Sequence, residues 1–462
     1  MALRLTNFRI RGLHDGITVD IPIEDNRLVL VGENGSGKTT IINLLYFLLS
    51  RQWHRLARYK FTELSVTIDG STVSLIHQDL YSTGTARALD EALGMVPPGR
   101  RETIETLLKR LRKMHRIPYT LLADISDDLD LPMDYLQAAL VGDEALQPTL
   151  FDDARALDSL EAKLKALVLQ QLLYLPTYRR IEQDLESIFP GSDFDQMIKR
   201  RGIGLPRGDR GYIELVEFRM QDVDQRIEQK MSALKDSVRN KLDKLTGSYL
   251  REVITGEYVS VDLANPEELR AEAIEPVLSR VGEDLLPEPE KNRLRIILRN
   301  IVQTNRIDEE HRVIAHFLLK LLDLHNAQQT EEAGVRTFVN TCNRYLSGKR
   351  LAYDNRDFRI DIELDSLENS QETNQTIKMK HLSSGEKQIV SLFSHLFLSG
   401  ASEFLVLIDE PELSLSVPWQ KTFLPDITET TGCVGLIAVT HSPFIFENVL
   451  DRYTHSINEY VG

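Results

Sequence analysis

The segment from Gly32 to Thr39 constrains the fold more than any other part of the chain. It reads Gly-Glu-Asn-Gly-Ser-Gly-Lys-Thr and matches the pattern G-x-x-x-x-G-K-[ST]. A short apolar run, 28–31, precedes it, and apolar residues at helical spacing follow it from Ile41 onward. Strand, glycine loop and helix in this order predict a phosphate-binding loop, in which backbone N–H groups and the helix N-terminus face an anion.

This loop also predicts which residues contact a nucleotide. Lys38 is expected between the β- and γ-phosphates, and Thr39 is expected to bind Mg²⁺. The other expected phosphate contacts are Asn34, Gly35, Ser36, Gly37 and Thr40.

A second apolar run, 404–408, ends in the acidic pair Asp409 and Glu410. A buried strand that delivers carboxylates at its C-terminal end suits a Walker B site. Asp409 is expected to hold the metal ion, and Glu410 is expected to polarise the attacking water as general base. An acidic turn after a strand is the simpler alternative, and the phosphate loop upstream disfavours it.

Two further segments, one on each side of this strand in the sequence, carry a signal. Ser383 and Ser384, followed by Gly385 and Glu386, open a predicted helix over 385–399, and helix capping alone would explain the serines. His441 follows another predicted strand, 434–439, and a lone histidine is usually structural.

Taken in order, these motifs resemble the ABC-type ATPase head. The segment 381–388 is similar to the superfamily's signature motif, whose serine and glycine reach the γ-phosphate held by a second subunit. His441 stands where the superfamily has its switch histidine. The opening residues 5–9 and the Ser-Ser-Gly-Glu-Lys form are similar to the branch with the SMC proteins, RecF and the OLD nucleases.

The resemblance implies an ATPase that needs ATP and Mg²⁺, with Glu410 and His441 as catalytic residues. It adds a group of nucleotide contacts from a neighbouring subunit: Ser383, Ser384, Gly385 and Glu386. Because such a site is divided between two chains, the resemblance also implies a dimer or higher oligomer of this chain.

The expected fold class is α/β, a P-loop NTPase head of ABC type with a large helical, partly coiled-coil insertion. Residues 1–80 and 351–462 are expected to form the two lobes of the head around one sheet, and 81–350 the insertion. Within it, 155–175 has helical spacing. The apolar steps within 214–252 indicate either a short antiparallel coiled-coil arm or an ordinary amphipathic helix.

Composition narrows the classes of function. The formal charge of −15 excludes a generally basic surface, although 199–211 is glycine-rich and basic. That segment is either a solvated loop or a contact for nucleic acid or an acidic partner. The two cysteines, Cys342 and Cys433, have no ligand-like spacing, which indicates a reducing, cytoplasmic location. No apolar run is long enough for a membrane span, so no membrane partner is expected.

Within its branch, the chain resembles the stand-alone ATPases of bacterial anti-phage defence systems such as PARIS, Septu and retrons. The segments 409–416 and 174–182 carry this resemblance. An OLD nuclease continues into a Toprim domain, and the sequence leaves no room for one after His441. We therefore expect a sensor or scaffold subunit that controls a separate toxic effector, a nuclease or another toxin.

The alternative is a RecF- or SMC-like DNA-repair ATPase that binds DNA directly. A transporter ATPase subunit is disfavoured by the long stretch between the phosphate loop and the signature segment. Two elements of the family pattern, the end of the D-loop and the Q-loop glutamine, are not assigned to a residue. Ser416 and Val417 stand where the D-loop usually carries an aspartate or histidine, and four residues are candidates for the Q-loop glutamine: Gln78, Gln170, Gln171 and Gln183.

Overall fold

A computed structural model describes most of the chain. The described ranges are 3–14, 16–82, 150–177, 211–215, 220–260, 286–304, 309–365, 376–400 and 403–462, with short pieces at 93, 101, 104–108, 125, 129, 275 and 278. The basic segment 199–210 lies outside them, as does the part of the segment 174–182 from 178 onward. The chain divides into two compact units, Met1–Phe218 with Gly400–Gly462, and Arg219–Ser399.

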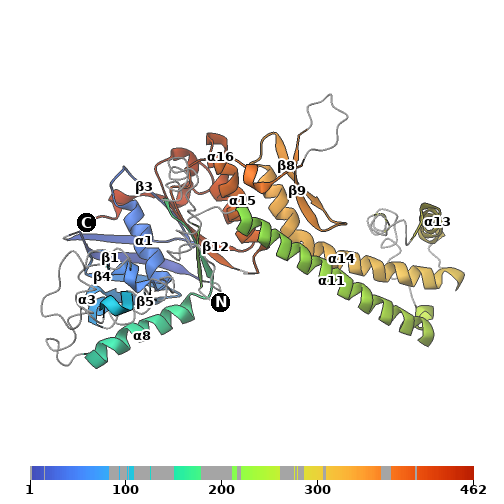
Figure 1. Ribbon diagram of the computed structural model, residues 1–462, viewed down its shortest axis with the longest axis horizontal. Coiled ribbons are helices and arrows are strands. Elements are labelled where there is room, and N and C mark those ends of the chain that lie inside the picture. The colour runs from blue at the N-terminus through green and yellow to red at the C-terminus, as the bar shows by residue number, and fades with distance from the viewer. Residues whose placement is uncertain are drawn as a thin grey trace. The chain divides into compact units, whose positions relative to one another are not determined.

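A six-stranded parallel sheet forms the centre of the first unit (Figure 1). Its order is β13 (Thr454–Ser456), β3 (Arg27–Val31), β12 (Cys433–Thr440), β11 (Phe404–Asp409), β6 (Gln171–Leu175) and β7 (Tyr212–Glu214). Every residue of β11 is buried, as expected for a parallel strand covered on both faces. Because all neighbours pair in parallel, the carboxyl ends of these strands lie at one edge.

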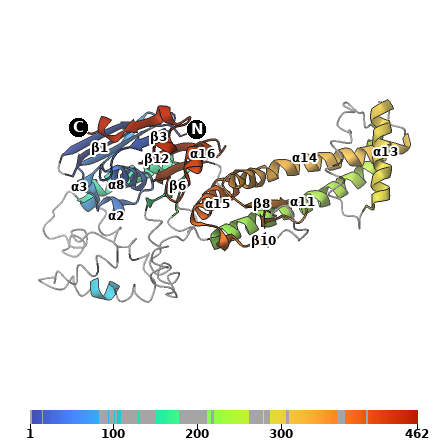
Figure 2. The same cartoon turned by 90° about the horizontal axis from the view of Figure 1, so that it is seen from above.

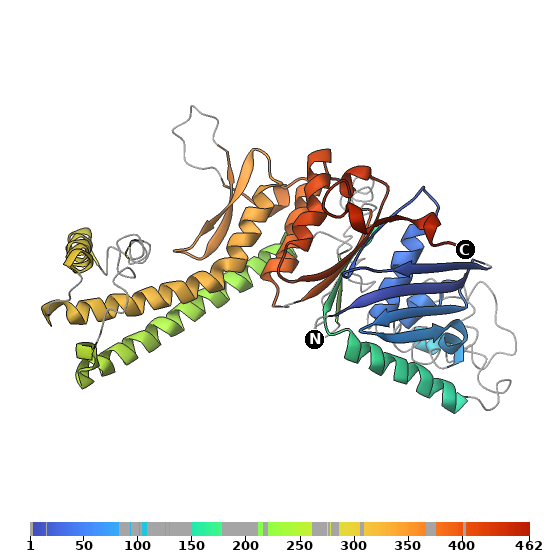
Figure 3. The same cartoon turned by 180° about the vertical axis from the view of Figure 1, so that it is seen from behind.

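A four-stranded antiparallel sheet belongs to the same unit. Its order is β2 (Ile17–Pro22), β1 (Leu5–Leu13), β4 (Glu63–Ile68) and β5 (Ser71–Ile76). Helix α1 (Lys38–Leu49) is buried on nearly all sides, and one hydrophobic core contains residues of both sheets and of α1 (Figure 3). Other helices that the structure describes in this unit are α2 (Trp53–Leu56), α3 (His77–Ser82), α8 (Leu150–Leu167) and α16 (Val417–Thr428).

The expectation of one sheet for 1–80 and 351–462 holds only in part. Only β3 from the first range joins the strands from the second. The other N-terminal strands have one buried and one more exposed face, which suits an antiparallel layer rather than a sheet covered on both sides. The helix that the spacing over 155–175 predicts is wrong at its C-terminal end, because residues 171–175 form strand β6. Short, fully apolar runs do not distinguish strand from helix by periodicity.

Two long helices, α11 (Met220–Thr255) and α14 (Glu309–Asn343), dominate the second unit (Figure 2). They run antiparallel, because Lys241 on α11 pairs with Glu331 while Glu252, further along α11, pairs with the earlier residue His316. The expected arm begins at residue 214, whereas helix α11 begins at Met220. Leu234 is buried in the pair, whereas Leu242 is 41% exposed.

A small sheet and helix α15 (Ser384–Leu398) lie at one end of the helix pair, and helix α13 (Glu288–Thr304) lies at the other end (Figure 2). The sheet is three-stranded and antiparallel, with the order β10 (Thr376–Ile377), β9 (Arg359–Leu364) and β8 (Lys349–Asp354). Helix α15 is mostly buried and packs against both α11 and α14. Helix α13 packs in a small separate cluster with α14.

The division into units differs from the expected lobes. It falls at 218/219 and 399/400 instead of 80/81 and 350/351. Strand β6 explains the first difference, because it pairs with β11 inside the parallel sheet. Among the helices that the structure describes, none is both long and apolar enough to cross a bilayer.

Candidate nucleotide-binding site

The loop between β3 and α1 requires glycine at defined places. Gly35 has φ +82° and Gly37 has φ +90°, in the left-handed region that side chains rarely adopt. A Cβ atom on Gly32 would lie 2.7 Å from Cγ2 of Ile457. The glycines of the sequence pattern therefore allow the backbone to curl immediately before α1, with the helix N-terminus facing the loop.

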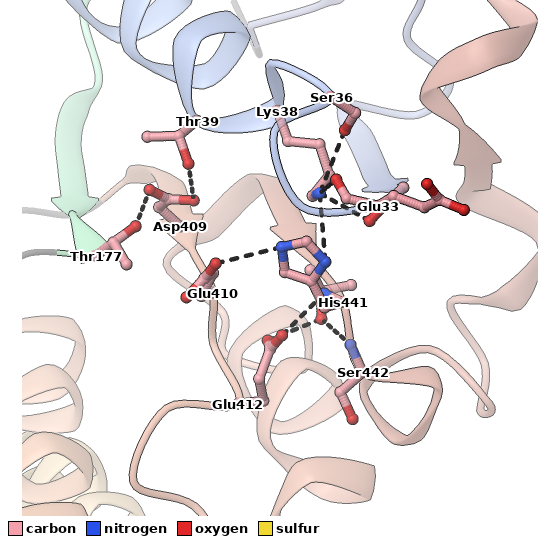
Figure 4. Close-up of polar contacts among 12 residues, drawn as sticks. Glu33, Ser36, Lys38, Thr39, Thr177, Asp409, Glu410, Glu412, His441 and Ser442 are labelled. Atoms are coloured by element: carbon pink, nitrogen blue, oxygen red, sulfur yellow. Dashed lines mark hydrogen bonds and ion pairs between the residues drawn. The ribbon is translucent and has the colours of Figure 1, made fainter.

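The side chain of Lys38 lies inside this loop, only 5% exposed (Figure 4). Its ammonium donates to the carbonyl oxygens of Gly32 at 2.7 Å and Glu33 at 2.8 Å. Burial lowers the pKa of Lys38, and the carboxylates of Glu410, then Asp409, oppose that shift. The loop thus holds a cation at the point where the sequence predicts phosphate oxygens.

The carboxylate of Asp409 is bracketed by two hydroxyl groups. Thr39 Oγ1 donates to its Oδ1 atom at 3.1 Å, and Thr177 Oγ1 donates to its Oδ2 atom. Asp409 is 1% exposed at the end of β11. Hydroxyl and carboxylate oxygens are the donors that Mg²⁺ prefers, together with waters and substrate phosphates. The donor set therefore fits Mg²⁺.

A protein-only metal cage is not part of this arrangement. Within the ranges that the structure describes, no cluster of three or more histidine, cysteine, aspartate or glutamate side chains could hold a metal ion. This agrees with the usual binding of Mg²⁺ through one or two protein groups and phosphate oxygens.

Glu410 and His441 face one another at the same sheet edge. Nε2 of His441 lies 3.4 Å from Oε1 of Glu410, and its Nδ1 lies 3.4 Å from Nζ of Lys38. The side chains of His441 and Glu410 are 30% and 24% exposed, so water has access to both. The φ of Glu410 is +50°, which turns the chain out of β11 directly after Asp409.

Most of the predicted contacts therefore converge. Lys38, Thr39, Asp409, Glu410 and His441 lie together in Figure 4. Of the other loop residues, Ser36 contributes an Oγ atom 3.4 Å from Nζ of Lys38. Asn34 is exposed in the loop, and Thr40 is half-buried in the first turn of α1.

The signature segment belongs to the second unit and opens α15. Ser383 is the N-cap residue, and its backbone N–H donates to Oε2 of Glu386 at 2.7 Å. Lys349 also pairs with this carboxylate. Glu386 is 4% exposed, so the structure uses it as a capping residue rather than as a group that is open to a nucleotide. Ser383 is exposed and Ser384 is half-buried.

Sequence reasoning missed two residues of this site, Thr177 and Glu412. Thr177 follows β6, next to the Walker B strand, and Glu412 accepts hydrogen bonds from Thr440 and His441. A polar residue just past a buried strand was the available signal for Thr177. The second glutamate of Asp-Glu-Pro-Glu was the signal for Glu412.

The candidate Q-loop glutamines lie elsewhere or outside the described ranges. Gln170 and Gln171 are at the start of β6, at the opposite end from Thr177, and Gln170 bonds to Glu403. Gln78 is in helix α3. Gln183 is outside the part of the chain that the structure describes.

Two family models match the chain. One, described as ABC transporter, matches residues 15–127, which contain the phosphate loop. The other, described as AAA domain, putative AbiEii toxin, Type IV TA system, matches 268–447, which contain the signature segment, Asp409, Glu410 and His441. The fold is that of an ABC-type P-loop ATPase. A helical insertion interrupts this ABC-type head, as the sequence predicts. A search of curated proteins found no match.

Solved structures similar to this chain include Smc head domains. One, from Pyrococcus furiosus, has an extended coiled coil and is bound to the C-terminal domain of ScpA. The two sequences are 14% identical, the match covers 96% of this chain and 91% of that chain, and the TM-score is 0.32. Another, from Pyrococcus yayanosii, has a coiled coil and joint, with 14% identity, 96% and 93% coverage and TM-score 0.30.

Proposed function

We propose that the chain binds ATP with Mg²⁺ at the edge of the parallel sheet and hydrolyses it. The observation that carries this proposal is the convergence of Lys38, Thr39, Asp409, Glu410 and His441. Cation, hydroxyl, paired carboxylates and imidazole at one phosphate loop are the groups that phosphoryl transfer to water requires.

Each group has a distinct role in this proposal. Lys38 and the backbone N–H groups of its loop bind the β- and γ-phosphates, where their positive charge stabilises the negative charge of the transition state. Thr39 and Asp409 hold Mg²⁺, which neutralises phosphate charge when it is bound. Glu410 is partly exposed and accepts a proton from the attacking water. His441, next to both Glu410 and Lys38, senses the γ-phosphate.

We further propose that a second copy of the chain completes the site. Ser383 and Ser384 are accessible at the N-terminus of α15, where backbone N–H groups favour an anion. Ser384 and Gly385 would then approach the γ-phosphate held by Lys38 of the other copy. The active form would be a dimer or a higher oligomer.

The Glu410→Gln variant tests the proposed hydrolysis. The amide keeps the shape of the side chain but does not accept a proton, so we expect kcat to fall on the order of 10²-fold or more. ATP binding should persist, whereas Lys38→Ala should lose it. Phosphate release and nucleotide titration measure the two effects. Hydrolysis by Glu410→Gln at the parent rate would show that Glu410 is not the base.

The biological role that we propose is that of a sensor or scaffold subunit in anti-phage defence. ATP occupancy would bias the assembly between holding and releasing a separate toxic effector, such as a nuclease. The observation that supports it is the resemblance of the motifs in 409–416 and 174–182 to those of defence ATPases.

Mass analysis of the complex, purified natively with the products of neighbouring genes, tests this role. We expect the chain in at least two copies together with an effector protein. The contrary outcome is a chain without such a partner that binds duplex DNA directly and loses that binding as salt rises, the behaviour of a RecF- or SMC-like ATPase.

A further inference from the structure

Glu412 joins the Walker B loop to the turn that carries His441. Its Oε1 atom accepts the backbone N–H of His441 at 2.8 Å, and its Oε2 atom accepts the hydroxyl of Thr440 at 2.7 Å (Figure 4). Thr440 is the last residue of β12 and is fully buried. One carboxylate thus binds the chain on both sides of the peptide that follows the strand.

The hydrogen-bond pattern requires an acceptor on both oxygens of Glu412. The N–H of His441 is only a donor. The Thr440 hydroxyl accepts the N–H of Ser442 at 3.0 Å and donates its own hydrogen to Glu412, because a carboxylate has no hydrogen to donate. A carboxylate satisfies both donors, whereas a glutamine amide has one acceptor and one donor end. Glutamine at 412 would therefore lose one of these bonds.

A second contact ties the same two segments together. Ser442 Oγ donates to Oε1 of Gln420 at 2.6 Å, and Nε2 of Gln420 donates to the Leu415 carbonyl at 2.9 Å. These two hydrogen bonds link Ser442 to Leu415 without involving Glu412. Gln420 keeps the loops together, so loss of Glu412 should release His441 without unfolding the segment.

The position of His441 depends on this turn. Its two ring nitrogens lie at 3.4 Å from Glu410 and from Lys38, at the long end of the hydrogen-bond range. A small displacement of the backbone would break both contacts, and a misplacement of about 1 Å can reduce a rate on the order of 10²-fold.

We infer that Glu412 is a positioning residue for ATP hydrolysis, which sets the imidazole of His441 between Glu410 and Lys38 by binding the backbone at Thr440 and His441. This inference rests on the proposed ATP hydrolysis. Glu412 acts through His441, and it does not touch the nucleotide.

A double-mutant cycle on kcat tests this coupling, with Glu412→Gln, His441→Ala and the combination. In the parent, we expect Glu412→Gln to lower kcat about 10- to 100-fold with KM within about twofold. In the His441→Ala background, the same substitution should change kcat by less than about twofold, because the group it positions is gone. Glu447→Gln, which removes an exposed carboxylate from the same segment, is the matched charge control and should keep the parent kcat.

Two results would overturn the inference. One is an unchanged kcat in Glu412→Gln, whether or not KM rises and the melting temperature falls. The other is an equal loss of kcat in the parent and in the His441→Ala background. If Glu412→Gln does not fold, Thr440→Val removes one of the two bonds in a nearly isosteric side chain, and Thr440→Ser should restore the rate. No hydrolysis by the parent chain would overturn the proposed function itself. Hydrolysis that Glu410→Gln abolishes but Glu412→Gln leaves intact would overturn only this inference.

Discussion

Nζ of Lys349 lies 3.0 Å from Oε2 of Glu386, so strand β8 is joined to the first turn of helix α15. The side chains are 16% and 6% exposed. Burial would raise the pKa of Glu386, but the N–H of Ser383 and the ammonium of Lys349 together hold this pKa below its ordinary value. The start of the signature segment therefore has a conformation that depends on a strand far from it in sequence.

Replacement of Lys349 by methionine should destabilise the second unit. The buried carboxylate of Glu386 would lose its charged partner, which costs about 1–3 kcal/mol when a buried polar group loses a hydrogen bond. Urea unfolding measures this free energy. Lys380→Met, at an exposed lysine just before α15, is the control. Equal unfolding midpoints for the two variants would contradict the role of this ion pair.

The Thr177→Val variant should weaken Mg²⁺ dependence rather than folding. Valine keeps the shape of threonine but removes the hydroxyl that donates to Oδ2 of Asp409, so the carboxylate is less well oriented toward Thr39. Residues that orient metal ligands typically contribute 10- to 100-fold in affinity or activity. We expect a higher Mg²⁺ concentration for half-maximal hydrolysis, with Thr177→Ser close to the parent. An unchanged Mg²⁺ titration of Thr177→Val would rule this role out.

Acid should loosen the pair of helices α11 and α14. The hydrogen bond from Lys320, supported by His316, lowers the pKa of Glu252 below its ordinary value of 4.5, and Lys241 does the same for Glu331. Since these pKa values are lower in the folded state, the unfolded chain binds more protons near pH 4.5. Their contribution to the unfolding free energy is thus present above about pH 4.5 and is lost as pH falls through the folded-state pKa values.

Helix content at a fixed moderate urea concentration, followed by circular dichroism from pH 7 to pH 3, measures this effect. Glu252→Gln should flatten the profile at its acidic end, because glutamine does not titrate. Glu257→Gln, just beyond the end of α11, is the matched control. A Glu252→Gln profile that parallels the parent would show that another group governs the acid response.

The local motifs could be predicted because each is contiguous in sequence. The loop at Lys38, the strand ending at Asp409 and the cap at Ser383 depend on nearest neighbours, and the structure has a phosphate loop, a buried strand and a helix start at these places. Thr177 could not be predicted in the same way. A polar residue just past a buried strand marks Thr177 locally, but its hydroxyl meets Asp409 across 232 positions, and no local pattern gives that partner.

The helix pair shows a similar limit. The seam from Ile227 to Leu245 predicted an apolar face, and Ile227 and Leu234 are indeed buried. Leu242 is exposed, because the burial of each residue depends on which side chains of the partner helix lie opposite it. At this level the contacts are polar, with Lys241 paired to Glu331 on α14. A periodic pattern gives the face of a helix, but the partner decides how much of that face is covered.

The order of strands in the parallel sheet has a consequence for synthesis of the protein. Strand β3 is made long before its neighbour β12, and Asn26 beside β3 bonds to the Val434 carbonyl, 408 positions later. At about 5–20 residues per second, a ribosome needs roughly 20–80 s to make that interval. The continuous segment 219–399 emerges complete within this time and can fold first. The nucleotide site contains Lys38, Asp409 and His441, so it cannot form until the segment 219–399 and the strands β11 and β12 after it have been made.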